Sequence, residues 1–311
     1  MQKLIKIGTR ASLLAMTQST NIKNLIEAQY PGTTVELVKI ITKGDKIVDV
    51  PLAKVGGKGL FVKELEEAML SREVDMAVHS MKDVPSELPD ELHIGVVTKR
   101  EDPRDAFLSV KYKTFSELPQ GAKVGTSSLR RKSQLAALRP DLIIEDLRGN
   151  LDTRIRKLDE GIYDAIILAT AGLNRMQWSD RITSKFSPEE MLPAVAQGAV
   201  GIELRKDNEE LLAGLAFLQD KETTIAVEGE RAFLHRLEGG CQVPIGAFGT
   251  VDGTQLTLTG LVASIDGKEV LKKQVAGEVG DTKTMGVKLA EELLDIGGRR
   301  ILEEVYGDSL A

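Results

Sequence analysis

Short apolar runs alternate with amphipathic segments along the first two-thirds of the chain, and this alternation predicts an α/β fold. Strands are predicted for runs rich in aliphatic and β-branched residues, at 3–8, 34–41, 74–80, 93–97, 122–126, 142–147 and 164–169. Helices are predicted where apolar residues recur at helical spacing, at 12–28, 60–70, 128–138 and 151–158. Strands separated by helices of this length predict two parallel, doubly wound α/β sheets.

The last third of the chain has a different pattern. Residues 246–275 form three runs of alternating apolar and polar residues, broken by Asp-Gly pairs at 252–253 and 266–267. Asp-Gly between alternating runs is a strong hairpin signal, so we predict a three-stranded antiparallel sheet. Helices predicted at 221–237 and 281–294 complete a small, separate α+β domain.

The two predicted α/β sheets open alike. Lys6–Thr9 reads KIGT and 123–126 reads KVGT, and in both places the strand passes through Gly-Thr and serine into a helix. Unpaired N–H groups at a helix N-terminus attract anions, and Ser12, Ser127 and Ser128 are suited to cap these helices. Two such domains, each presenting a helix N-terminus to a shared cleft, would bind an anionic ligand.

The charge distribution favours the same class of ligand. The net charge of −6 and the 4% aromatic content argue against a nucleic-acid-binding protein. Between Lys123 and Lys157, however, nine basic residues accompany only four acidic ones, and six of the nine are arginines. A guanidinium group matches carboxylate or phosphate, so this segment indicates binding of a small anion. For any single arginine, a solvated helix face is the alternative.

Cys241, in LEGGCQVPIG at 237–246, is the only cysteine of the chain. It has no disulfide partner, and on the residue alone a small buried hydrophobe is the expected role. The sequence suits a protein of the reducing cytoplasm in three respects. Its cysteine is unpaired, its start has no recognisable secretory signal, and it has no apolar run of membrane-spanning length. The three histidines are scattered without metal-ligand spacing, so no metal site is expected. His235, six residues before Cys241, leaves a cysteine hydrolase as an alternative.

Two further stretches are candidates for chemistry. AVHSMKDVP at 77–85 follows a predicted strand and places Ser80, Lys82 and Asp83 at its carboxyl end, where open α/β sheets bind ligands. An ordinary turn before Val-Pro is the alternative for this stretch. KVGGKGLF at 54–61 is rich in glycine but lacks phosphate-loop spacing, so we expect a mobile lid rather than a nucleotide site.

Five motifs together resemble the porphobilinogen deaminase family, also called the hydroxymethylbilane synthases. The resemblance spans almost the whole chain, with Thr9 and Met16 as slight departures from residues common in the family. The motifs are HSMKDVP at 79–85, GTSSLRRKSQL at 125–135, LRGNLDTR at 147–154, PAVAQG at 193–198 and LEGGCQVPIG at 237–246.

The resemblance implies a transferase that condenses four porphobilinogen molecules, with loss of ammonia, into the linear tetrapyrrole hydroxymethylbilane, a step of haem and porphyrin biosynthesis. It also implies a dipyrromethane cofactor held as a thioether on Cys241. A thiolate is a strong nucleophile toward an electrophilic methylene carbon, and Gly239 and Gly240 permit close approach of the backbone.

By the same resemblance, the cationic and hydroxyl side chains acquire roles. The residues implied to bind the cofactor are Ser80, Lys82, Asp83, Thr126, Ser128, Arg130 and Arg131. Those implied to bind substrate and the growing chain are Arg10, Ser12, Arg148, Arg154, Arg175 and Gln197. Lys54, Lys58 and Phe61 would belong to the lid. Asp83 would be the catalytic residue, a buried carboxylate that stabilises the cation formed when ammonia leaves and that accepts or returns protons.

The family fold implied is two domains of the periplasmic-binding-protein type plus a small domain that carries the cysteine. A crossover strand near Val200 to Leu204 would return to the first domain. The expected boundaries are 1–99 with 200–219, then 100–199, then 220–311. The resemblance also implies a cytoplasmic monomer without nucleic-acid or membrane partners, with hand-off of its product to uroporphyrinogen-III synthase. A solute-binding protein for an anion explains the arginines equally well, but not the domain that carries the cysteine.

Overall fold

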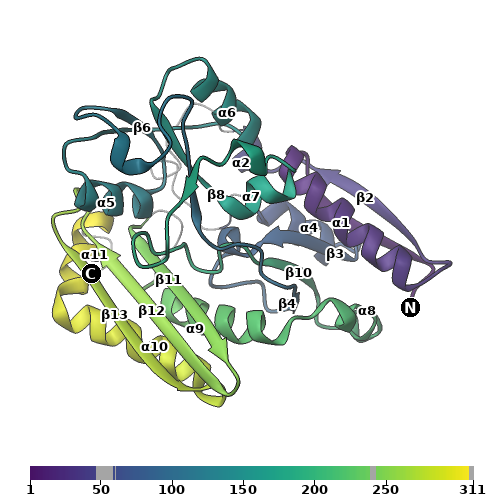
Figure 1. Cartoon of the computed structure of the whole chain (residues 1–311). Helices are drawn as coiled ribbons and strands as arrows, with labels where there is room; N and C mark the ends of the chain where they lie inside the picture. Colours follow the sequence, from purple (N-terminus) through teal and green to yellow (C-terminus); the bar gives the residue numbers. More distant parts are fainter. Residues whose placement is uncertain (47–58, 60, 239–242, 308–311) are drawn as a thin grey trace. The chain divides into compact units, whose positions relative to one another are not determined.

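The computed structural model describes residues 1–46, 59, 61–238 and 243–307 of the chain. It forms two compact units (Figure 1). The first unit comprises Met1–Arg100 and Ala199–Thr224, and the second comprises Glu101–Gly198 and Ile225–Ala311. The three-domain boundaries expected from the family remain a prediction.

The first unit is built on a five-stranded sheet of order β2-β1-β3-β10-β4. Its strands are β1 (Leu4–Arg10), β2 (Thr34–Ile40), β3 (Met76–Ser80), β4 (Leu92–Val97) and β10 (Val200–Arg205). Its helices are α1 (Leu13–Gln29), α2 (Lys43–Lys46), α4 (Lys63–Leu70) and α8 (Glu209–Leu215), with short 3₁₀ turns at Met81–Asp83 and Ala216–Leu218. Helices α1 and α8 pack on one face of the sheet and α4 on the other, because side chains alternate between the faces of each strand.

The second unit contains a sheet of the same design, with order β7-β6-β8-β5-β9. Its strands are β5 (Asp105–Leu108), β6 (Lys123–Gly125), β7 (Ile143–Glu145), β8 (Ala165–Ala169) and β9 (Ser184–Lys185). Its helices are α5 (Leu129–Leu138), α6 (Leu151–Asp159) and α7 (Thr170–Arg175), with 3₁₀ turns at Phe115–Glu117 and Ser179–Arg181. Gly8 of β1 pairs with the neighbouring strand β3, and Gly125 of β6 pairs in the same way with β8. The KIGT and KVGT repeats therefore occupy equivalent positions in the two sheets.

The prediction of wholly parallel sheets is wrong in one respect. In the first unit, β10 runs antiparallel to both β3 and β4, and in the second, β5 runs antiparallel to β8 and β9. Each of these strands enters its sheet where the chain passes from one unit to the other, without the helical crossover that a parallel strand requires. The fold class itself, two α/β sheets and a small antiparallel one, is confirmed.

The predicted three-stranded sheet is also confirmed. It consists of β11 (Ile245–Asp252), β12 (Gln255–Ala263) and β13 (Val270–Glu278), paired antiparallel in that order. Gly260 of β12 lies against side chains of α9 (Lys221–Arg236) and α10 (Thr282–Leu293), which cover one face. A 3₁₀ turn at Val279–Asp281 precedes α10, and a kink at Leu294–Gly298, where Gly297 has φ of 120°, leads into α11 (Arg299–Tyr306). In the part of the chain that the structure describes, no helix combines the length and apolar character needed to cross a membrane.

Candidate functional site

Predicted site residues of the first unit gather at the carboxyl ends of β1 and β3. These strands are parallel neighbours, so the residues that follow them emerge at one edge of the sheet. Ser12 caps α1, and its Oγ accepts from Ala15 N at 3.4 Å. One turn further along α1, Gln18 Nε2 donates to Ser80 Oγ at 3.0 Å. Helix α1 therefore binds the end of β3 directly.

The side chain of Arg10, the last residue of β1, is held in place by a carboxylate and an aromatic ring. Its Nε and Nη2 donate to the Asp45 carboxylate, at 3.1 Å and 2.5 Å from Oδ1. Its guanidinium carbon lies 4.2 Å from the centroid of the Phe61 ring, a cation–π contact. Asp45 in turn accepts from Thr42 Oγ1 at 2.8 Å. Burial opposes ionisation of Asp45, but its hydrogen bonds from Arg10 and Thr42 outweigh this effect and lower its pKa.

Asp83 closes the 3₁₀ turn after β3. Met81 anchors this turn, since its side chain is buried and its N–H donates to Ala199 O at 3.0 Å. Gly201 makes room for it, because a Cβ there would lie only 2.1 Å from Met81 Sδ. The Asp83 side chain is exposed, so the expectation of a buried carboxylate is wrong for this structure. The turn presents the carboxylate to solvent.

A buried ionisable cluster lies behind the same turn. His79 Nε2 lies 2.9 Å from Glu203 Oε2, and the two side chains are 5% and 0% exposed. Glu66 of α4 lies close enough for Glu203 to affect its titration. Burial raises the pKa of Glu66 to about 7, and the negative charge of Glu203 acts in the same direction.

In the second unit, Arg130 and Arg131 meet on one buried carboxylate. Arg130 Nη1 donates to Asp105 Oδ2 at 2.7 Å, and Arg131 Nη2 donates to Asp105 Oδ1 at 2.7 Å. Gln197 Nε2 adds a third contact to Oδ1 at 3.0 Å. Backbone carbonyls complete the arrangement, since Arg130 also donates to Leu192 O and Arg131 to Ile167 O. The structure thus brings together three of the predicted site residues.

This cluster carries a surplus positive charge in a buried place. Asp105 is 0% exposed, Arg130 3% and Arg131 6%. Burial opposes ionisation of Asp105, yet the two guanidinium groups outweigh burial and hold its pKa well below the usual range. Among the described residues, no acceptor faces the buried Nε–H of Arg130. Two cations share one anion here, so the arrangement suits a further acceptor group such as a carboxylate.

The other three predicted site arginines of the second unit lie in a loop and in two helices. Arg148 lies in the loop after β7, 3.7 Å from Asp146 Oδ2. Arg154 of α6 donates from Nε to Gly149 O at 2.8 Å, and Gly149 has φ of 107°, which favours glycine. Arg175 ends α7, and its Nη2 donates to Gly198 O at 2.6 Å.

The serine hydroxyl groups predicted to cap α5 do not form the expected hydrogen bonds to the helix. Ser128 holds the N-cap position but makes no side-chain hydrogen bond to the helix. Instead its N–H donates to Thr126 Oγ1 at 3.3 Å, and Ser127 Oγ donates to Leu147 O at 2.8 Å. The helix N-terminus is therefore not closed by the Ser128 hydroxyl.

Cys241, Lys54 and Lys58 lie outside the described residues, as does most of the expected lid. Around Cys241, the chain is described up to Glu238 and again from Val243 onward. Leu237 and Val243 are both 3% exposed, and a Cβ at Gly246 would lie 3.3 Å from Arg130 Cδ. The segment that follows the cysteine therefore lies beside the arginine cluster within the second unit.

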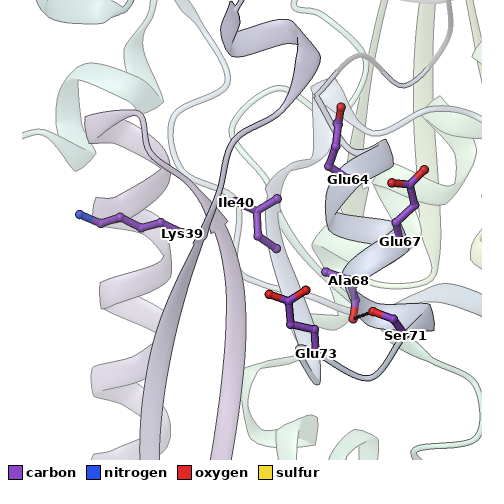
Figure 2. A pocket seen from close by; sticks show the side chains of 7 residues that line it. All are labelled: Lys39, Ile40, Glu64, Glu67, Ala68, Ser71 and Glu73. Atoms are coloured by element: carbon purple, nitrogen blue, oxygen red, sulfur yellow. Dashed lines mark hydrogen bonds between the residues drawn. The ribbon is translucent and has the colours of Figure 1, made fainter.

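A surface cavity of about 450 Å³ lies elsewhere on the first unit. Figure 2 shows Glu64, Glu67 and Glu73 around it, while Lys39 points away from them. Three carboxylates repel an anionic ligand, so this cavity does not suit the ligand that the arginines indicate. Across residues 1–46, 61–238 and 243–307, no group of three or more His, Cys, Asp or Glu side chains is placed to hold a metal ion.

Asp105, Glu203 and Glu66 were not identified from the sequence. Asp105 stands in DAFL and Glu203 in VGIELR, both fully buried strands. For Glu203, an acidic residue inside an otherwise apolar run is the available signal, because a buried carboxylate requires a cationic or hydrogen-bonding partner. Asp105 follows the charged stretch REDPR at 100–104 and gives no such signal. The partner in each case comes from a distant segment.

The strand-end cations and the buried arginine pair define an α/β protein suited to binding carboxylate groups. Residues 5–213 match the family described as "Porphobilinogen deaminase, dipyromethane cofactor binding domain", and residues 224–295 match "Porphobilinogen deaminase, C-terminal domain". The chain belongs to the porphobilinogen deaminase family, a family of enzymes.

Relatives match over nearly the full length. A porphobilinogen deaminase from Syntrophobacter fumaroxidans is 58% identical over 305 residues, which cover 98% of each chain. Another from Trichlorobacter lovleyi is 56% identical over 309 residues, 99% of each chain. Among solved structures, the methionine-binding protein MetQ has a TM-score of 0.45 at 18% identity, covering 71% of this chain and 92% of that one. A periplasmic substrate-binding protein of an ABC transporter from Coxiella burnetii has a TM-score of 0.45 at 14% identity, covering 71% and 94%.

Proposed function

We propose that this enzyme condenses four porphobilinogen molecules into hydroxymethylbilane, releasing one ammonia at each condensation, on a dipyrromethane primer bound to Cys241. The observation that carries the proposal is the Asp105 cluster, in which two buried guanidinium groups share one carboxylate. Nothing in the described part of the chain accepts from the Arg130 Nε–H, which suits a further carboxylate, and each pyrrole unit carries an acetate and a propionate. When bound, the primer supplies the nucleophilic pyrrole carbon to which new units are added.

The chain's own groups have separable tasks in this reaction. Arg130 and Arg131, together with Ser80, Lys82, Thr126 and Ser128, bind the carboxylates of the primer. Arg10, Ser12, Arg148, Arg154, Arg175 and Gln197 bind the carboxylates of the substrate and the growing chain. Because Asp45 already occupies the Nε edge of Arg10, the opposite edge of its guanidinium group is the one offered to a ligand.

Asp83 acts on the substrate pyrrole. Ammonia leaves once the amine is protonated, and it takes the electron pair of its C–N bond while the ring nitrogen donates electrons to the ring. The exposed carboxylate of Asp83 accepts a hydrogen bond from that ring N–H, stabilises the developing positive charge and moves protons. Its place on a turn anchored by Met81 fixes it at the end of β3.

The remaining assignments complete the proposal. Cys241 attaches the primer through a thioether, and Lys54, Lys58 and Phe61 contact the bound chain. The protein acts in the cytoplasm as a monomer and hands its product to uroporphyrinogen-III synthase.

The intact mass of the denatured, purified protein tests the proposal. We expect the mass to exceed that of the polypeptide by two linked pyrrole units, and we expect Cys241→Ser to show the polypeptide mass alone. Loss of the thiol removes the only sulfhydryl able to form the thioether.

Incubation with porphobilinogen covers the case of protein isolated without its primer. Such protein gains the two-ring mass and then releases ammonia and tetrapyrrole. Bare polypeptide that gains no mass and releases no ammonia contradicts the proposal and favours a protein that only binds its ligand. Added mass that survives in Cys241→Ser contradicts the attachment site.

A further inference from the structure

Glu230 of α9 binds two distant segments with one buried carboxylate. It is 0% exposed. Its Oε2 accepts from Ala196 N at 2.5 Å, and its Oε1 accepts from Gly249 N at 2.8 Å. Glu230 therefore connects the turn at 193–198 to strand β11. Ala247 N donates to Pro193 O at 3.2 Å and links the same two segments a second time.

The turn that Glu230 binds is strained. Ala196 has φ of 57°, in the left-handed region that residues with a Cβ seldom adopt. Such a conformation persists where surrounding contacts fix it. The hydrogen bond from Ala196 N to a buried, charged acceptor is such a contact, and charged acceptors form the stronger hydrogen bonds.

The residue after the strained position belongs to the arginine cluster. Gln197 is 1% exposed, and its Nε2 donates to Pro103 O at 2.7 Å and to Asp105 Oδ1 at 3.0 Å. Asp105 also receives both Arg130 and Arg131. A change in the backbone at Ala196 moves Gln197, and a shift of Gln197 disturbs the carboxylate on which both guanidinium groups are oriented.

We propose that Glu230 is a positioning residue for the Arg130–Arg131 cluster. It holds Ala196 in its left-handed conformation, so that Gln197 fixes Asp105 and Asp105 orients the two guanidinium groups toward a ligand's carboxylates. This inference rests on the proposed function. A carboxylate is required at this position because two N–H groups need two acceptors, whereas a glutamine offers one acceptor and turns a donor toward the other N–H.

Three variants separate this positioning role from a purely stabilising one: Glu230→Gln, Ala196→Gly and the double variant. For each, we measure the fraction of chains that carry the two-ring mass, kcat per chain that carries it, and the urea midpoint. In Glu230→Gln one of the two buried N–H groups loses its acceptor. We expect kcat per loaded chain, meaning per chain that carries the two-ring mass, to fall about tenfold or more. Glycine adopts φ of 57° without strain, so Ala196→Gly in the Glu230→Gln background restores most of the lost kcat. Ala196→Gly alone stays near wild type.

Thr282→Val is the matched control in the same unit. Thr282 is 4% exposed, and its hydroxyl donates to Val279 O at 2.8 Å, away from the turn. We expect a lower urea midpoint with unchanged kcat per loaded chain. If Glu230→Gln does not fold, Glu230→Asp, which keeps the charge but withdraws it by one methylene, is measured in the same way.

The outcomes are distinct. If Glu230→Gln or Glu230→Asp loses stability but keeps kcat per loaded chain, or if glycine at 196 restores nothing, the positioning role is wrong. If the wild-type chain never acquires the two-ring mass, the proposed function fails instead.

Discussion

At the scale of single residues, the cations predicted to bind ligand are held by the protein's own carboxylates. Arg10 is paired with Asp45, and Arg130 and Arg131 share Asp105. These pairings orient the guanidinium groups before a ligand arrives, so less side-chain entropy is lost on binding. Breaking such a buried pair costs about 3–5 kcal/mol, because a charge is left without compensation. Asp105 is therefore as important to the cluster as either arginine.

Asp83 differs from these acids because it is exposed and its substitution leaves no buried charge unpaired. We expect Asp83→Asn to fold normally, to keep the two-ring mass and to lose about 10²- to 10³-fold in kcat, the usual effect of removing one stabilising group from a transition state. Steady-state release of ammonia from porphobilinogen measures this loss. Asp90→Asn, an exposed aspartate of the same unit, is the control and should turn over normally. Near-normal kcat in Asp83→Asn contradicts the catalytic assignment.

At the scale of elements, α4 packs a titrating group against the sheet. Glu66 has a folded-state pKa of about 7 against an ordinary value of 4.5, mainly because of burial. Between those two values the folded state binds more protons than the unfolded state, so this group lowers stability as pH rises. His79, Glu203, Glu67 and Lys63 are the ionisable neighbours that influence it.

Glu66→Gln removes this titration. We expect the variant and the wild type to have similar free energies of unfolding near pH 4.5, and the variant to gain about 1–2 kcal/mol relative to wild type above pH 7, after allowance for solvent screening. Urea unfolding at pH 5 and pH 8 measures the difference. A stability difference that is equal at both pH values argues against the raised pKa.

Most elements could be predicted from the sequence, and the exceptions have physical reasons. Helices such as α1 and the β11–β13 meander are long enough for their periodicity to be read. Strands β5 and β9 have four and two residues, too few to show a period. The antiparallel direction of β10 and β5 depends on how the chain passes between units, which no local pattern records. For the same reason, Arg130 and Arg131 could be identified as candidates, but their partner Asp105 could not.

At the scale of the whole molecule, the first unit is interrupted in sequence. Strand β10 lies between β3 and β4 but comes about a hundred residues after β4. Without β10, both neighbouring strands present unpaired edges, a known cause of aggregation. Thr98 N donates to Val200 O at 2.9 Å, so the two ends of the interruption are adjacent in space.

This arrangement predicts the behaviour of shortened chains. Residues 1–100 alone should aggregate, whereas a chain in which a short turn joins Arg100 directly to Ala199 and ends at Thr224 should fold cooperatively, because the β4–β10 pair becomes a hairpin. Circular dichroism and urea unfolding distinguish the two. A soluble, cooperatively folded 1–100 fragment contradicts the need for β10.

The interruption also has a consequence for synthesis. On the ribosome, all five strands of the second unit's α/β sheet, from Asp105 to Lys185, are made before β10 emerges. The sheet that the chain begins first is therefore completed after the sheet that it begins second. Through that interval the nascent chain exposes the unpaired edges of β3 and β4, which is the kind of surface that chaperones protect from aggregation.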